Sequence, residues 1–129
     1  TSYTDAKAPA GKSSTYTVIA VSSDPNYKNS AKSAGAGVTM LKKVTKLKVK
    51  AQKGGAKITF KKVKGAKKYL IYRASNKNGP YKKVKALKAK QTSFVDKKLK
   101  KGKYYYKVVV QKGKLYSPAV ISKRVSVKK

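Results

Sequence analysis

The amino-acid sequence predicts an all-β fold, and three observations lead to that prediction. First, apolar residues alternate with lysine along residues 46–51 and again along residues 57–61, which is the pattern of a strand with one buried and one solvated face. Second, clusters of glycine, asparagine and proline separate such runs at spacings of about 8–12 residues, as in sandwiches and barrels. Third, no segment sustains the spacing of an amphipathic helix.

The expected strands follow one another from residue 46 onward. The Gly54-Gly55 pair predicts the turn that ends the first strand, and Gly65 interrupts the run after the second. Asn76–Pro80 is dense in turn chemistry, because asparagine and glycine accept positive φ and proline fixes its own. Lys112–Lys114 predicts a hairpin turn before the last strand. The strands are expected at residues 46–51, 57–61, 69–73, 84–86, 93–95, 104–110 and 116–127.

Alternation also predicts which side chains of these strands face the core, since residues two apart in a strand share a face. Tyr104 and Tyr106 therefore lie on one face of their strand and Tyr105 lies on the other. The inward-facing set is expected to be Leu47, Val49, Ile58, Phe60, Tyr69, Ile71, Val84, Phe94, Leu99, Tyr106, Val108 and Val110.

Part of the chain is repeated. Thr1–Asp5 (TSYTD) matches Thr92–Asp96 (TSFVD), and a glycine stands six residues beyond each aspartate. Tyr16–Ala20 (YTVIA) then matches Tyr106–Val110 (YKVVV), after a gap that is one residue shorter in the second copy. Further on, Tyr27 with Ser30 corresponds loosely to Tyr116 with Ser117. Several landmarks in the same order predict two copies of one structural module.

Several segments of the second copy together resemble bacterial fibronectin type III-like modules, which are immunoglobulin-like β-sandwiches of secreted and surface proteins. Residues 58–73 (ITFKKVKGAKKYLIYR) resemble strands B and C of that family, with Phe60 where an aromatic residue, usually tryptophan, stands. Residues 79–84 (GPYKKV) resemble the C′ region, and residues 92–96 resemble strand E. Residues 99–108 (LKKGKYYYKV) resemble the corner that leads into strand F.

The resemblance implies a seven-stranded β-sandwich whose two sheets pack their inner faces together. Two departures are visible, because Phe60 replaces the usual tryptophan and Lys101 the usual proline, but Phe60 still suits a core position. With the repeat, the resemblance predicts a complete module at residues 44–129, preceded at residues 1–43 by the C-terminal half (strands E–G) of another module plus a linker. Since a lone hairpin is marginal in water, we expect Thr1–Val38 to pack on the next module or another polypeptide, or to be poorly ordered.

The composition excludes most catalytic chemistry. The chain of 129 residues has no histidine and no cysteine, which removes imidazole bases, thiolate nucleophiles, zinc sites and disulfides. It has no glutamate, and Asp5, Asp24 and Asp96 are far apart in sequence, so little is available for a calcium cage or a catalytic carboxylate pair. Asp5 and Asp96 follow equivalent segments of the repeat and are expected to cap turns by accepting hydrogen bonds from nearby backbone amides. We therefore expect no enzyme activity, no cofactor and no metal.

The number of lysines is much higher than a purely structural module requires. The chain has 35 Lys+Arg against 3 Asp+Glu, for a net charge of +32, and only Arg73 and Arg124 are arginine. The lysines are either a solubility coat that blunts edge-strand aggregation or a surface that binds an anionic polymer through counterion release. Tyr105 is the candidate for stacking on such a ligand. The candidate polyanion-binding residues are Lys46, Lys48, Lys50, Lys57, Lys61, Lys82, Lys83 and Lys107.

By resemblance, we expect a non-catalytic structural or adhesive accessory module of a modular extracellular protein, associated with the cell wall of a Gram-positive bacterium. It would space another domain of the parent protein and tether it to an anionic polymer, first wall teichoic acid and next a glycosaminoglycan. No apolar run approaches the roughly 18 residues of a transmembrane helix, so no membrane span is expected. Two alternatives stay open: protein–protein assembly in which a partner's strands complete the first module, and non-specific nucleic-acid binding. Sequence-specific nucleic-acid recognition is not expected, since it favours arginine.

Overall fold

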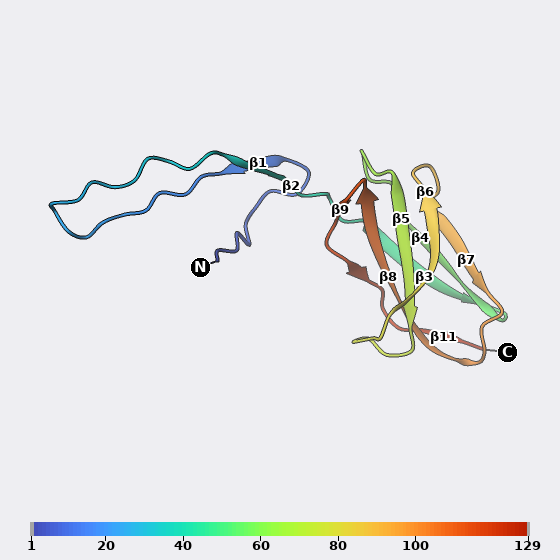
Figure 1. Cartoon of the computed structure of the whole chain (residues 1–129). Coiled ribbons are helices and arrows are strands. Elements are labelled where there is room, and N and C mark those ends of the chain that lie inside the picture. The colour runs from blue at the N-terminus through green and yellow to red at the C-terminus, as the bar shows by residue number, and fades with distance from the viewer. Residues whose placement is uncertain (1, 129) are drawn as a thin grey trace. The chain divides into compact units, whose positions relative to one another are not determined.

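The computed structural model describes residues 2–128, and every regular element in that range is a β-strand. The all-β prediction is therefore confirmed. The chain divides into two compact units, unit 1 (residues 1–40) and unit 2 (residues 41–129), and most of their strands are labelled in Figure 1. Within the described range, no helix is long and apolar enough to cross a membrane.

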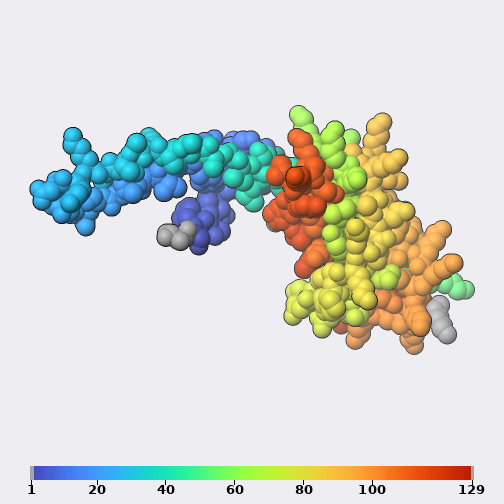
Figure 2. Space-filling model, viewed as in Figure 1, coloured from blue at the N-terminus to red at the C-terminus, as the bar shows by residue number. Residues whose placement is uncertain are grey.

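Unit 1 is built around a long antiparallel hairpin (Figure 1). Strands β1 (Ser13–Tyr16) and β2 (Ala36–Thr39) pair along their full lengths. Beyond them the two arms stay side by side, as Figures 1 and 2 show, and Ser30 and Ser33 hold them together through hydrogen bonds to the opposite arm. The side chains of this hairpin are mostly exposed.

Unit 2 is a sandwich of two antiparallel sheets that enclose one apolar core. The smaller sheet has the order β3-β4-β7, and the larger has the order β10-β8-β5-β6, with β9 and β11 also paired to β8. The strands are β3 (Thr45–Gln52), β4 (Gly55–Lys61), β5 (Lys68–Ala74), β6 (Lys82–Lys88), β7 (Ser93–Lys97), β8 (Gly102–Lys112), β9 (Leu115–Tyr116), β10 (Val120–Ile121) and β11 (Val125–Val127).

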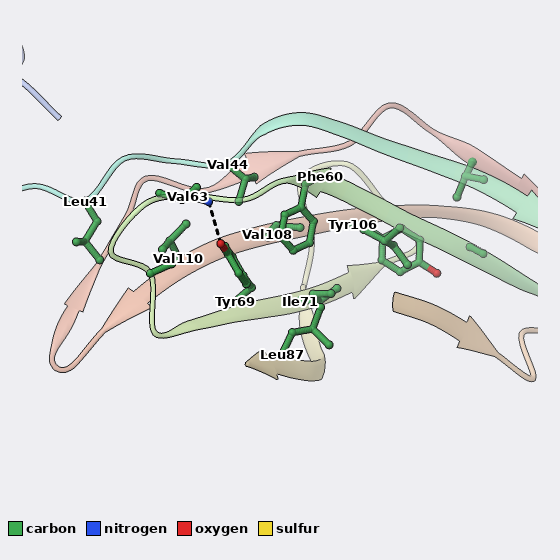
Figure 3. Packing of buried hydrophobic residues seen from close by; sticks show 14 of the residues in the cluster. Leu41, Val44, Phe60, Val63, Tyr69, Ile71, Leu87, Tyr106, Val108 and Val110 are labelled. Atoms are coloured by element: carbon green, nitrogen blue, oxygen red, sulfur yellow. Dashed lines mark hydrogen bonds between the residues drawn. The ribbon is translucent and has the colours of Figure 1, made fainter. Parts of the chain in front are cut away.

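The core of unit 2 contains the whole inward-facing set that alternation predicts. Ile58, Phe60, Tyr69, Ile71, Tyr106, Val108 and Val110 are buried, and Leu47, Val49, Val84, Phe94 and Leu99 are half-buried against them. At its centre the Phe60 and Tyr69 ring centroids lie 4.7 Å apart with the rings tilted by 57°, an arrangement favoured by aromatic quadrupoles. The buried Tyr69 hydroxyl accepts a hydrogen bond from the Val63 amide at 2.9 Å (Figure 3).

The core also takes in residues that the prediction leaves out. Leu41 and Val44 are buried although they precede the first strand, so the unit begins slightly before residue 44. Leu87 is buried. Alternation along the strand predicted at residues 84–86 instead places Ala86 on the same face as Val84. A register shift in the pairing of β5 with β6 changes the phase, which places Leu87 opposite Tyr69 and leaves Ala86 exposed.

The single strand predicted at residues 116–127 is wrong, because the structure divides it into β9, β10 and β11. Ser117 and Ser122 mark the breaks. Each donates its amide to a carbonyl of β8, while its Oγ accepts the amide of that same β8 residue, at Val110 and Tyr106 respectively. These side-chain bonds replace part of the regular ladder, and Pro118 has no amide with which to restore it.

Candidate functional site

The lysines predicted to bind polyanions are on the strands, but they do not converge on one site. Lys48, Lys50 and Lys57 are exposed on the smaller sheet, with Lys50 directly opposite Lys57 in the ladder. Lys46 lies there too, at an irregular position of β3 with φ of 54°, and Lys61 ends β4. The larger sheet carries the remaining three, Lys82 and Lys83 on β6 and Lys107 on β8.

Within the described part of the chain, internal ion pairs do not neutralise the lysine charges. Among residues 2–128 the one salt bridge joins Arg73 to Asp96, with Nη1 and Oδ2 2.7 Å apart. No lysine of this range pairs with the carboxylate of Asp5, Asp24 or Asp96. Because like charges opposite each other in a ladder are destabilising, the Lys50–Lys57 pair repels unless an external anion or salt screens it.

Lys107 belongs to a cluster that the sequence analysis missed in part. Its Nζ lies 4.8 Å from the centroid of the Tyr72 ring and 4.9 Å from that of Tyr81, close enough for cation–π attraction to both. The pKa of Tyr81 is raised by burial first and by the nearby Tyr105 second. We call Tyr72, Tyr81, Tyr105 and Lys107 the tyrosine–lysine cluster. Alternation along β5 places Tyr72 on the face opposite to Tyr69, outside the core. This was the signal in the sequence that could have identified Tyr72 as a member of the cluster.

Tyr105, the predicted stacking residue, is half-buried and lines an open groove of about 580 Å³. The groove is also lined by Lys77, Ile121, Ser122, Lys123 and Arg124. Its cations come from the β5–β6 loop and from the segment after β10, and none of them is a predicted polyanion-binding residue. The groove thus combines an aromatic face with positive charge, which suits a ring-bearing anion.

The turn-capping role predicted for Asp96 is wrong. It is buried, and its Oδ2 accepts hydrogen bonds from the Tyr106 hydroxyl at 2.9 Å and from Arg73 Nη1 at 2.7 Å. It does not cap a turn through backbone amides, because it lies in β7 and points across the sandwich to β5 and β8. Burial, and then the bond to Asp96, raise the pKa of Tyr106.

Asp5 makes the predicted turn-capping bond and one more. Its Oδ1 accepts the amide of Lys7 at 2.8 Å, and its Oδ2 accepts the hydroxyl of Tyr16 at 2.8 Å. The bond from Tyr16 raises the pKa of that phenol. Asp5–Tyr16 in unit 1 therefore has the same hydrogen bond as Asp96–Tyr106 in unit 2, at the positions that the sequence repeat aligns.

Tyr104 forms the corner that the family resemblance implies. Its hydroxyl donates to the carbonyl of Lys100 at 3.0 Å, four residues upstream. The guanidinium of Arg73 lies 5.8 Å from its ring centroid. The phenols of Tyr104 and Tyr106 thus have structural partners, which leaves Tyr105 as the residue of the three that faces a groove.

The residues described offer little to hold a metal. Within residues 2–128, no three histidine, cysteine, aspartate or glutamate side chains gather as a metal site would require. Asp96, the buried carboxylate, is already bound to Arg73 and Tyr106.

Comparisons with known proteins identify the fold. No family model matches the chain, and no curated protein matches it. Among solved structures, an Fn3-like protein from Clostridium thermocellum has 22% identity and a TM-score of 0.55, over 66% of this chain and 88% of that one. A structure named FN3tt has 19% identity and a TM-score of 0.57, over 65% and 90%.

Two further structures resemble this chain within longer proteins. The FN1–FN3 domains of chicken CNTN1 have 18% identity and a TM-score of 0.58, over 98% of this chain and 46% of that one. A β-1,2-glucanase from Parabacteroides distasonis has 26% identity and a TM-score of 0.51, but only 12% of that chain is covered. Most of these structures are fibronectin modules, which are generally non-catalytic, and the chain accordingly has a fibronectin type III-like fold.

Proposed function

We propose that this chain is a non-catalytic structural module that adheres to anionic polymers through its lysine coat. The observation that carries the proposal is the set of exposed lysines on both sheets of unit 2, without a carboxylate partner in the described range. Such cations are free to displace counterions from a polyanion, which gives affinity that is strong at low salt and independent of sequence.

The distribution of charge favours a long polymer over a compact ligand. Lys50 and Lys57 lie on one sheet and Lys83 and Lys107 on the other, so no single small anion spans them. Lysine contacts phosphate as a hydrated point charge and lacks the bidentate geometry of arginine. Wall teichoic acid, with a phosphate in each repeating unit, matches this chemistry, and the proposal therefore includes a location outside a Gram-positive cell.

A spacer role follows from the remaining chemistry. The buried Asp96 is engaged by Arg73. The phenol of Tyr106, like any tyrosine, is protonated at neutral pH, and burial raises its pKa further. Neither group is available as a general base at neutral pH. The module then contributes distance and attachment to its parent protein, while any catalysis belongs to another domain.

The test is co-sedimentation of the chain with Gram-positive cell walls, with and without teichoic acid, across a salt series. We expect binding that requires the teichoic acid and falls steeply with salt. Heparin and duplex DNA serve as soluble competitors. Binding that is absent at physiological salt, or insensitive to salt, would reject the adhesive role and leave a spacer with a solubility coat.

Two triple variants test whether the charge acts as a coat. The first is Lys48→Gln, Lys50→Gln and Lys57→Gln on the smaller sheet, and the second is Lys82→Gln, Lys83→Gln and Lys107→Gln on the larger one. Each removes the same charge, so a diffuse coat predicts equal loss of binding and an equally reduced salt slope. A loss confined to the second triple would instead place the ligand at the tyrosine–lysine cluster.

A further inference from the structure

The hairpin of unit 1 repeats the hydrogen bonds of the hairpin that follows β8 in unit 2. The Ser30 amide donates to the Ala20 carbonyl, and Ser30 Oγ accepts the Ala20 amide, both at 2.9 Å. Ser117 makes the same two bonds with Val110, both at 2.9 Å. Ala20 and Val110 each stand four residues after the tyrosine that binds the equivalent aspartate. This agreement in side-chain detail makes the two hairpins structural counterparts.

The correspondence identifies an apolar face that is largely exposed, with Tyr16 and Met40 half-buried at one end, where Tyr3 and Ala8 line the same hollow. In the aligned register Val18 corresponds to Val108, and Val38 to Val125. Val18 is 71% exposed and Val38 50%, whereas Val108 is 0% and Val125 6% exposed. In unit 2 these positions belong to the core that the β3-β4-β7 sheet closes. We call Tyr16, Val18, Ala20, Val38 and Met40 the apolar strip of unit 1.

The same arm has a free edge. The backbones of Thr17 and Ile19 have no hydrogen-bond partner among the described residues. Their counterparts Lys107 and Val109 are paired with β5. An unpaired strand edge is a template for another strand, and here it lies on the arm that carries the apolar strip.

We propose that the apolar strip and the free edge of unit 1 bind a fibronectin-type segment of the kind formed by residues 41–91. One strand of that segment would pair with residues 16–21 as β5 pairs with β8, and its other sheet would cover the strip as β3 and β4 cover β11. A second copy of this chain is not the occupant, because its own residues 41–91 are already packed on its own β8. This inference is independent of the polymer-binding proposal.

The test places an additional copy of residues 41–91 directly ahead of the full chain and measures amide hydrogen exchange. We expect the amides of Thr17, Ile19 and Val18 to exchange about 100-fold more slowly, or slower still, than in the unextended chain, as in a cooperative folded unit. Unchanged exchange while unit 2 stays protected would overturn the proposal. Slow exchange already in the unextended chain would overturn it too, and if it rose with protein concentration the occupant would be a second copy.

Two variants of the extended chain locate the segment. Val18→Lys places a charge on the apolar strip and is expected to abolish the new protection. Ile19→Lys places the same charge on the opposite face of the same arm, where Val109 is the counterpart, and is expected to keep it. Equal loss in both variants, or loss in neither, would contradict the placement of the segment on the strip.

Discussion

The Asp96 carboxylate joins the two sheets of unit 2. It lies in β7 of the smaller sheet and binds Arg73 of β5 and Tyr106 of β8 in the larger one. Each partner offsets part of the cost of burying a carboxylate. Unit 1 keeps the tyrosine bond in Asp5–Tyr16, where the carboxylate is only half-buried. The pair is thus a recurring structural feature of the module.

The substitution Tyr106→Phe tests how much the hydrogen bond from Tyr106 to Asp96 contributes to stability. The substitution keeps the ring in the core and removes the hydroxyl that donates to Asp96. We expect a loss of about 1 kcal/mol in the free energy of unfolding at pH 7, the usual net value of a hydrogen bond, measured by urea unfolding. No change in the midpoint would show that solvent replaces the hydroxyl at Asp96.

Comparison with the same variant also tests how the stability contributed by the Tyr106 hydroxyl depends on pH. The pKa of Tyr106 is raised in the folded state above its ordinary value of 10.0, so its contribution is complete below about pH 10. Above that pH the unfolded chain ionises first, and the contribution falls as pH rises towards the folded pKa. We expect wild-type stability to fall from pH 10 to 11 relative to Tyr106→Phe, while lysine deprotonation affects both proteins alike. A constant difference would contradict this.

At the scale of elements, serine hydroxyls decide where strands break. Ser122 Oγ accepts the buried amide of Tyr106 at 3.0 Å and donates to the Lys123 carbonyl at 2.8 Å. Ser33 does the same between Val18 and the carbonyl of Ala34 in unit 1. These hydroxyls satisfy amides that a straight ladder would satisfy with carbonyls.

Ser122→Ala should therefore destabilise unit 2. It leaves the Tyr106 amide buried without its acceptor, which costs about 1–3 kcal/mol. Ser126→Ala is the matched control, because Ser126 is exposed on β11 and its substitution should change stability by less than about 0.5 kcal/mol. Urea unfolding of both variants measures the difference, and equal midpoints would mean that water takes over as the acceptor.

The strands of unit 2 could be predicted from sequence because their alternation is local. In β3 and β4 lysine alternates with apolar residues, and this alternation alone identifies the solvent face and the core face of each strand. The burial of Leu87 could not be predicted from sequence, since it depends on a register shift between β5 and β6. Nor could the tyrosine–lysine cluster, which brings Tyr72, Tyr81 and Lys107 together from three segments. The bond from Arg73 to Asp96 could not be predicted either, because it joins two strands of different sheets.

At the scale of the whole molecule, a net charge of +32 on 129 residues opposes the compact state through self-repulsion. The Lys50–Lys57 pair is a local instance, with two cations opposite each other in one ladder. The core of unit 2 must overcome this repulsion in solution. A bound polyanion would remove it, so adhesion and stability are coupled by linkage.

Salt should therefore stabilise unit 2. The Debye length falls from about 10 Å at 0.1 M to about 3 Å at 1 M, which screens repulsion between neighbouring lysines. If screening contributes about 1 kcal/mol, the Tm of unit 2 should rise by about 4–8 °C, as followed by circular dichroism in NaCl. Lys50→Gln with Lys57→Gln removes the opposed pair, and its Tm should exceed that of the wild type at 0.1 M and approach it at 1 M. A Tm that is insensitive to salt would mean that the lysines are too far apart and too well hydrated to repel, and the linkage between adhesion and stability would then be lost.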